Sequence, residues 1–257
     1  MLGPLHARVG DRAVHVGGRR AQTVLAALTL ERDRAIGVDR LIDVVWADNP
    51  PQSARTQVAM AVSALRRCLG QAGGDPTVIE TVHGAYRLRA ADVRLDASSA
   101  ESLVRHARAA AAGHAAGHAA ALYRNALMLW RGPVLAGLTG PVMDAARMRW
   151  EETRLTVTEE LAAVELGRGR HREVTGDLMA VVTEHPYRER PRAQLMTALS
   201  LAGRQAEALA VYREGRRKLT TELGLEPGAE LRDLHQAILA GARCEEVQAM
   251  SGLMSCG

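Results

Sequence analysis

"QSARTQVAMAVSALRRCLG", residues 52–70, is the stretch that decides the fold. Its apolar residues recur every three or four positions, which is typical of an α-helix that buries one side. The buried side consists of Val58, Val62, Leu65 and Leu69. The other side carries arginines, amides and hydroxyls, and no Asp or Glu occurs from residue 49 to residue 74. The stretch predicts a helix of about five turns that presents a cationic surface.

The sequence before this helix predicts a β-hairpin and two further helices. "LHARV" and "RAVHV" flank Gly10 and Asp11, and apolar residues at the helical period then follow from Ala21 to Leu28 and from Leu41 to Trp46. "ADNPPQSA" must be a turn because its prolines interrupt a helix, and Ser53 is placed to cap the helix that follows.

The sequence after this helix predicts a second hairpin. "TVIETVHGAYRLRA" has two β-rich runs on either side of His83, Gly84 and Ala85. A helix-turn-helix pair followed by a β wing is a plan for binding DNA, with the basic helix as the third helix. We expect an α+β winged helix-turn-helix domain over residues 1–92.

The second half of the chain predicts an all-α domain over residues 96–241. Residues repeat at an interval of 34, which is the length of a tetratricopeptide repeat. The matching pairs are Leu161 with Leu195, Gly169 with Gly203, Arg170 with Arg204, and Glu173 with Glu207. A last striped helix closes the stack, and residues 242–257 are expected to form a flexible tail. The chain as a whole is expected to be mainly α.

Composition narrows the class of protein. The net charge of +4 permits an anionic partner, and the three cysteines lack metal-ligand spacing. We expect an intracellular, nucleoid-associated protein of the cytoplasm, since the N-terminus lacks a signal pattern and no run is long enough to span a membrane. His114 and His118 have the spacing of two ligands on one helix face, but no acidic residue or cysteine lies near to complete a metal site. Catalytic and cofactor-binding motifs are also missing, so we expect neither an enzyme nor a cofactor.

Several strings resemble one family, the Streptomyces antibiotic regulatory proteins. "VDRLIDVVWADNPPQSA", "LRRCLG" and "AYRL" are similar to its OmpR-type winged helix. "LWRGPVLAGL", "SLAGRQAEALAVYR" and "ELGLEPGAELRDLHQAIL" are similar to its bacterial transcriptional activator domain. The last string is the most specific of these, because general helix physics does not require it.

The resemblance implies a transcriptional activator of antibiotic or other secondary-metabolite genes. It further implies dimers bound to direct repeats near a promoter and recruitment of the RNA polymerase holoenzyme. Polymerase would contact the turn before the third helix, at Asp48, Asn49, Pro50 and Gln52.

Eight residues are predicted to contact double-stranded promoter DNA: Thr56, Gln57, Met60, Ser63, Arg66, Arg67, His83 and Arg87. Gln57 suits an adenine edge and Met60 a thymine methyl, whereas Thr56, Arg66 and Arg67 suit phosphates or the groove edge. Tyr86 is interpreted as wing packing, because one aromatic residue makes no stacking platform.

Three positions depart from related winged helices. Ala61 and Ala64 stand where relatives often carry longer donors, and His83 stands where they often carry an arginine. Two other hypotheses stay open, the first of them because of Ala61 and Ala64. One is a helical scaffold that binds only protein, and the other is a regulator gated by a small molecule in the repeat domain.

Overall fold

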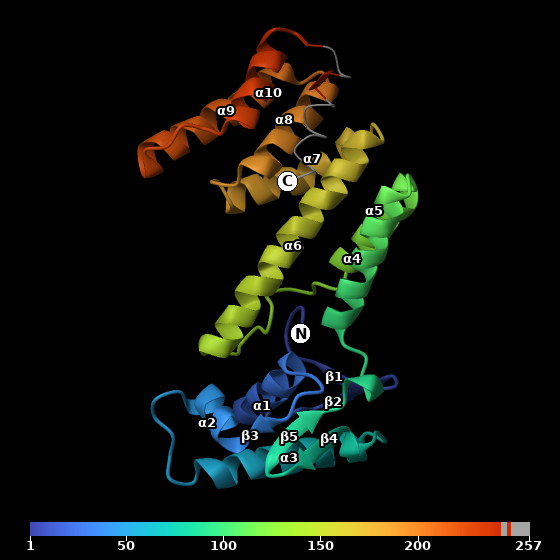
Figure 1. Ribbon diagram of the computed structural model, residues 1–257, viewed down its shortest axis with the longest axis vertical. Coiled ribbons are helices and arrows are strands. Elements are labelled where there is room, and N and C mark those ends of the chain that lie inside the picture. The colour runs from blue at the N-terminus through green and yellow to red at the C-terminus, as the bar shows by residue number, and fades with distance from the viewer. Residues whose placement is uncertain (243–245, 248–257) are drawn as a thin grey trace. The chain divides into compact units, whose positions relative to one another are not determined.

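The structure is a computed structural model that describes residues 1–242 and 246–247 (Figure 1). Apart from Ala242, Glu246 and Val247, the predicted tail lies outside the described residues, as do Cys244 and Cys256. The chain forms two compact units. The first combines Met1–Glu101 with Met128–Thr153, and the second combines Ser102–Leu127 with the residues from Arg154 onward.

The first unit contains the winged helix. A hairpin of β1 (Ala7–Val9) and β2 (Arg12–Val14) precedes α1 (Arg19–Leu30), β3 (Ile36–Gly37), α2 (Val38–Trp46) and α3 (Ala54–Gln71). Two 3₁₀ turns, Pro76–Val78 and Ala90–Asp92, flank β4 (Ile79–Val82) and β5 (Ala85–Leu88). The larger sheet is antiparallel with the order β3–β5–β4, so β4 and β5 form the wing (Figure 1). The predicted winged helix-turn-helix is therefore present.

The apolar side of α3 lies in the core, as its sequence predicts. Val58, Val62 and Leu65 are no more than 2% exposed and pack in one cluster with residues of α1 and α2. Ser53 stands at the N-cap of α3, but the predicted capping hydrogen bond is absent. Its hydroxyl instead accepts a hydrogen bond from Gln57 Nε2 at 2.9 Å.

Residues 128–153 complete the core of the first unit. Trp130, Leu138, Met143 and Trp150 are buried in the same cluster as α1 and α3. The two indole rings meet edge to face, with centroids 6.2 Å apart. The division of the sequence at residues 92–96 thus stays a prediction, because the compact unit around the winged helix also takes in this later segment.

The second unit is helical. Its helices are the later parts of α4 (Asp96–Ala112) and α6 (Pro141–Gly167), together with α5 (Ala116–Leu127), α7 (His171–Glu184), α8 (Glu189–Leu201), α9 (Gln205–Lys218) and α10 (Ala229–Leu239). A π-helical turn, Leu219–Leu223, extends α9. Successive helices from α7 to α10 pack on one another around a buried cluster. The predicted helical domain is present.

The 34-residue interval is visible in the backbone. Gly169 before α7 and Gly203 before α9 both have a positive φ, of 73° and 75°, which favours glycine. In both places the arginine that follows the glycine forms an ion pair with the glutamate three residues further on. Arg170 pairs with Glu173 at 3.2 Å, and Arg204 pairs with Glu207 at 2.6 Å. The likeness to tetratricopeptide repeats stays a prediction.

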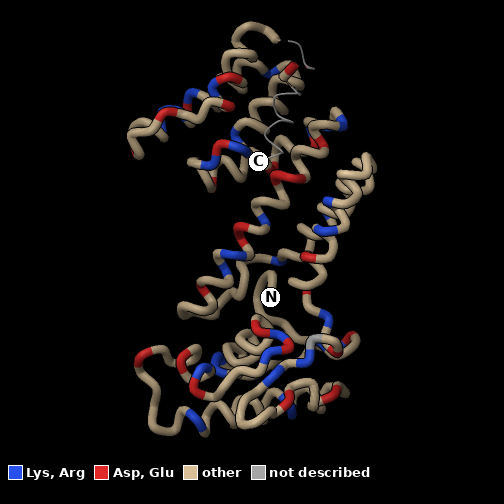
Figure 2. The backbone as a smooth tube through the Cα atoms, viewed as in Figure 1, with Lys and Arg blue, Asp and Glu red and all other residues tan. Residues whose placement is uncertain are grey.

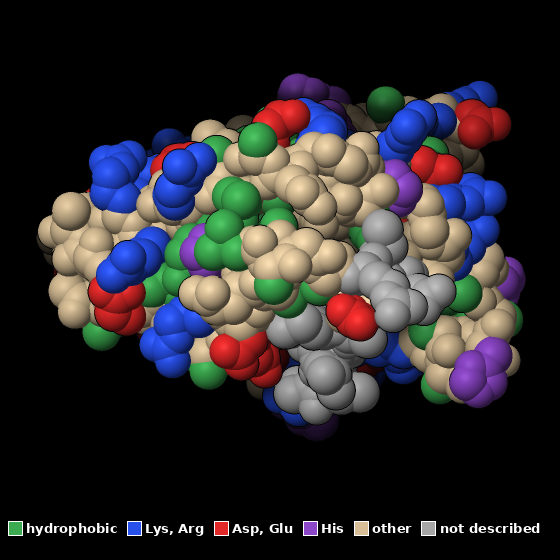
Figure 3. All heavy atoms as spheres, turned by 90° about the horizontal axis from the view of Figure 1, so that it is seen from above, with side chains coloured by type: hydrophobic (Ala, Val, Ile, Leu, Met, Phe, Trp, Pro, Cys, Tyr) green, Lys and Arg blue, Asp and Glu red, His purple; other side chains and the backbone are tan. Residues whose placement is uncertain are grey.

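Several charged residues of the second unit form ion pairs. On the face shown in Figure 3, side chains of Lys and Arg lie beside those of Asp and Glu at several places. Arg216 with Glu226 at 2.8 Å is one such ion pair on the surface. Glu165 is fully buried and meets two arginines, Arg124 at 2.7 Å and Arg168 at 2.8 Å.

The structure also gives the positions of His114 and His118. His114 lies in the turn before α5 with a φ of 60°, so the four-residue spacing does not put it on one helix face with His118. Within the described ranges, no three His, Cys, Asp or Glu residues gather as a metal site. No helix there is long and apolar enough to cross a bilayer.

Candidate nucleic-acid interface

The exposed side of α3 carries four of the predicted DNA contacts in one row. Thr56, Met60, Ser63 and Arg67 are exposed and follow one another at intervals of four, three and four residues. We call these four residues the α3 row. Met60 is 65% exposed, and Arg67 forms no ion pair or hydrogen bond with any described residue. The tube of α3 carries no acidic residue (Figure 2), so a free guanidinium stands at the end of an uncompensated row.

Gln57 lies beside the α3 row and not on it. Its side chain is half-buried, and Nε2 donates to Ser53 Oγ at 2.9 Å. Its Oε1 atom is shielded from solvent and has no hydrogen-bond partner among the described residues. Gln57 must therefore leave Ser53 before its amide can meet a base edge.

The wing ends in a two-residue turn. Val82 on β4 pairs with Ala85 on β5, and the intervening His83 and Gly84 both have a positive φ, of 48° and 79°. Two positive φ values in succession define a type I′ hairpin turn, which suits the twist of the strands. This turn places His83 at the exposed tip of the wing.

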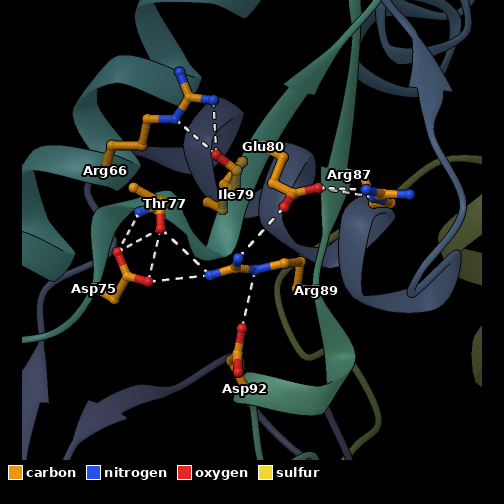
Figure 4. Close-up of polar contacts among 8 residues, drawn as sticks. All are labelled: Arg66, Asp75, Thr77, Ile79, Glu80, Arg87, Arg89 and Asp92. Carbon is orange, nitrogen blue, oxygen red and sulfur yellow. Dashed lines mark hydrogen bonds and ion pairs between the residues drawn. The ribbon is translucent and has the colours of Figure 1, made fainter.

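Arg66 connects α3 to the wing. Its Nε and Nη2 atoms donate to the carbonyl oxygen of Ile79 at 2.9 and 2.7 Å (Figure 4). Nη2 also donates to Thr81 Oγ1 at 2.9 Å. The guanidinium lies 6.0 Å from the centre of the Tyr86 ring. Tyr86 itself is half-buried and packs against the core, so the interpretation of this ring as wing packing is confirmed.

Arg87 on β5 and Arg89 directly after that strand are held by carboxylates. Arg87 donates to Glu80 Oε2 through Nε at 2.9 Å and through Nη2 at 2.6 Å (Figure 4). Arg89 reaches Asp75 at 3.1 Å, Asp92 at 2.9 Å and Glu80 at 3.5 Å. Hydrogen bonds from Thr77, and then the charge of Arg89, lower the pKa of Asp75. Arg66 and Arg87 are therefore already occupied, in contrast to Arg67.

Most residues of the turn between α2 and α3 are exposed to solvent. Asp48, Asn49, Pro50 and Gln52 are all exposed, and Ala47 before them has a φ of 50°. The backbone NH of Asn49 donates to Trp46 O at 3.2 Å, so the turn is pinned at the end of α2. All four residues predicted for polymerase are thus accessible on one short loop.

A hollow of about 800 Å³ opens next to the α3 row. We call it the α1 hollow. The residues that line it include Arg19, Arg20, Trp46, Gln57, Met60 and Thr139. Arg19 Nη2 donates to Thr139 Oγ1 at 2.9 Å, and the Arg20 guanidinium lies 5.7 Å from the centre of the Trp46 ring. The part played by Thr139 was not predicted, and no local pattern signals a contact across 120 residues.

The two alanines that depart from related winged helices lie off the α3 row. Ala61 is 9% exposed and lines the α1 hollow, and Ala64 is half-buried. The two positions where relatives often carry longer donors therefore lie on the flank of α3 and not on its exposed row.

Two families of domains match the chain. "Transcriptional regulatory protein, C terminal" matches residues 13–88, and "Bacterial transcriptional activator domain" matches residues 95–239. The second match covers more than half of the chain.

Curated relatives cover nearly the whole chain. The regulatory protein AfsR of Streptomyces coelicolor is 40% identical over 240 residues, which are 93% of this chain and 24% of AfsR. The regulatory protein DnrI of Streptomyces peucetius is 34% identical over 248 residues, which are 93% of this chain and 90% of DnrI. This chain therefore spans about a quarter of the length of AfsR and most of that of DnrI.

A solved structure has the same fold. It is that of Mycobacterium tuberculosis EmbR in complex with a low-affinity phosphopeptide, which is 32% identical and matches with a TM-score of 0.89. The match covers 99% of this chain and 68% of EmbR.

Proposed function

This chain belongs to the Streptomyces antibiotic regulatory protein family of transcriptional regulators, and we propose that it activates transcription by binding promoter DNA in a sequence-specific manner. The family and the relatives are regulators of transcription, which are not enzymes. The observation that carries the proposal is the α3 row, where Arg67 is exposed, forms no ion pair with any described residue and stands in a stretch of sequence without Asp or Glu.

In this proposal α3 enters the major groove. Thr56, Ser63 and Arg67 contact phosphates or the groove edge, and Met60 contacts a thymine methyl. Gln57 exchanges its bond to Ser53 for an adenine edge, which also gives its unpartnered Oε1 a donor. His83 enters the adjacent minor groove from the tip of the wing.

Arg66 and Arg87 have a different part in the same proposal. Both are bonded within the first unit: Arg66 ties the wing to α3, and Arg87 joins the two strands of the wing to each other. A wing fixed in this way loses less conformational freedom when DNA binds.

Activation is proposed to proceed by recruitment. The exposed loop at Asp48, Asn49, Pro50 and Gln52 contacts the RNA polymerase holoenzyme, while dimers bind direct repeats near the promoter. The antibiotic or secondary-metabolite genes near its own gene are the proposed targets. Support comes from the family and from the accessibility of the loop.

The test is a salt titration of binding to labelled duplexes from the promoters that adjoin its own gene. A protein that neutralises six to ten phosphates loses about 10³ to 10⁵ in affinity between about 50 and 200 mM salt. We expect a steep loss of this kind together with a footprint on direct repeats. Binding that is absent at low salt, or that does not respond to salt, would overturn the proposal in favour of a protein-binding scaffold.

A further inference from the structure

The α1 hollow lies on one flank of α3, and its charge differs from that of the opposite flank. On the wing side, a second hollow of about 670 Å³ contains Arg66 but also the carboxylate of Glu80. The α1 hollow contains Arg19 and Arg20, and no acidic residue lines it. The exposed Met60 belongs both to the α3 row and to the rim of the α1 hollow, so the two surfaces are continuous.

Both arginines of the α1 hollow are held by neutral groups. Arg19 is bonded to the Thr139 hydroxyl, and Arg20 lies against the face of Trp46. A hydroxyl and an indole fix the position of a guanidinium without cancelling its charge, unlike the carboxylates that hold Arg87 and Arg89. Arginine also stays protonated at any physiological pH. The hollow therefore holds two positive charges whose positions are fixed and which no carboxylate in its lining neutralises.

We propose that the α1 hollow is a second phosphate-binding site, which takes the DNA backbone on the side of α3 opposite the wing. This inference rests on the proposed function and adds to it. Major-groove binding brings one phosphate strand to each flank of the recognition helix, and planar guanidinium groups suit phosphate oxygens. Arg19 and Arg20 contact the phosphate, and Thr139 is a positioning residue for Arg19.

The site draws on both matched regions of the sequence. Arg19 and Arg20 lie within residues 13–88, whereas Thr139 lies within residues 95–239. A residue of the activator region thus sets the geometry of a contact made by the winged helix, inside one compact unit.

The experiment measures Kd for a specific and a random duplex across a salt series. The variants are R19A, R20A, T139V and T139S, and the control is R172A, an exposed arginine of α7 in the second unit. Each arginine variant should weaken binding to both duplexes by the same factor and lower the log–log salt slope by about 0.9. T139V should weaken binding while the salt slope stays near that of the wild type, because Arg19 keeps its charge. T139S should restore wild-type binding, and melting curves should show that every variant is folded.

Three outcomes would overturn the proposal. Arginine variants that bind like R172A would show that the hollow does not meet DNA, even where R67A weakens binding and the proposed function stands. A loss confined to the specific duplex would indicate base reading and not phosphate contact. Inorganic phosphate that raises the melting temperature of the wild type but not of R20A, with DNA binding unchanged, would assign the hollow to a free anion. Failure of the wild type to bind any duplex would instead refute the proposed function itself.

Discussion

Arg87 and Glu80 face each other across the wing as a directly opposed pair of the antiparallel register, and two hydrogen bonds of 2.9 and 2.6 Å join them. Their side chains are 38% and 24% exposed, so the pair is partly shielded from solvent. The carboxylate of Glu80 thus already binds the guanidinium of Arg87, which the sequence predicts to contact DNA.

Replacing this carboxylate should strengthen DNA binding. In E80Q the ion pair to Arg87 is replaced by a weaker neutral contact and the wing loses a negative charge, so affinity should rise at low salt and the salt slope should steepen by about 0.9 for one added phosphate contact. The double variant E80Q/R87A is the control. If the double variant keeps the gain in affinity, Arg87 is not its source. Ion pairs of this exposure contribute about 0–1 kcal/mol, so melting should change little.

Replacing Arg67 and replacing Gln57 should change DNA binding in different ways. R67A removes a sequence-independent contact, so affinity for all duplexes should fall together and the salt slope should decrease by about one unit. Q57A should instead relax discrimination at one or two base pairs, at a cost of about 1–3 kcal/mol if the contact is bidentate. Binding assays on a set of single-base variants of the site separate the two patterns. A uniform loss in Q57A would mean that Gln57 positions the helix and reads no base.

The loop before α3 should affect activation more than binding. D48A/N49A removes two exposed side chains that pack on nothing in the core, so DNA affinity should stay near that of the wild type. Run-off transcription with purified RNA polymerase holoenzyme at saturating protein should fall. D11A, at the exposed turn of the first hairpin, is the matched control and should activate normally. Unchanged transcription in the double variant would contradict the proposed polymerase contact.

Two glycines should respond to alanine in opposite directions. A Cβ atom at Gly215 would lie 2.4 Å from Nε of Arg192, which is 1% exposed and bonded to the carbonyl oxygens of Pro186 and Val211. G215A should therefore destabilise the second unit by about 1–3 kcal/mol. Gly176 lies inside α7 with no atom near its missing Cβ, so G176A should stabilise it by up to about 1 kcal/mol. Chemical denaturation measures both, and a stabilised G215A would contradict the packing described.

The stack of His235 on Tyr212 should make stability depend on pH. The rings lie 3.8 Å apart at 11°, and burial, followed by the charges of Arg213 and Arg216, lowers the pKa of His235 below 6.5. The unfolded chain then binds more protons than the folded one as the pH falls through this range. The stabilisation is complete above about pH 6.5 and is lost as the pH falls toward the folded pKa.

The variant H235F keeps an aromatic ring in the stack but cannot be protonated. Its melting temperature should fall less than that of the wild type between about pH 7 and pH 5. The control is H106F, a replacement at an exposed position of α4, which should keep the wild-type dependence. Parallel curves for H235F and the wild type would show that this residue does not control the effect.

How much of the structure could be predicted from the sequence depends on how far apart in the chain the interacting residues lie. The side of α3 that is buried depends on local periodicity, so Val58 and Val62 could be assigned to the core and Met60 and Arg67 to the surface. The pairing of Glu80 with Arg87 was also within reach, because a two-residue turn at His83 and Gly84 fixes the register of the strands. The prediction that Arg87 contacts DNA leaves out this cross-strand partner.

Other contacts have no signature in the neighbouring sequence from which they could be predicted. The bond from Arg66 to Ile79 O depends on how α3 packs against β4, and backbone acceptors do not appear in a sequence pattern. The bond from Arg19 to Thr139 joins residues that the matched domain families place in separate regions. The helical position of Gln57 predicts a free amide, but its Nε2 atom donates to the hydroxyl of Ser53.

The burial of Leu138, Met143 and Trp150 with the winged helix has a consequence for protein engineering. A chimaera that grafts only residues 1–92 from one relative onto another would combine two halves of a hydrophobic core with different evolutionary histories. Such a graft would lose operator affinity through misfolding and not through altered recognition. An exchange of specificity between relatives should therefore transfer residues 1–101 and 128–153 together as one cassette.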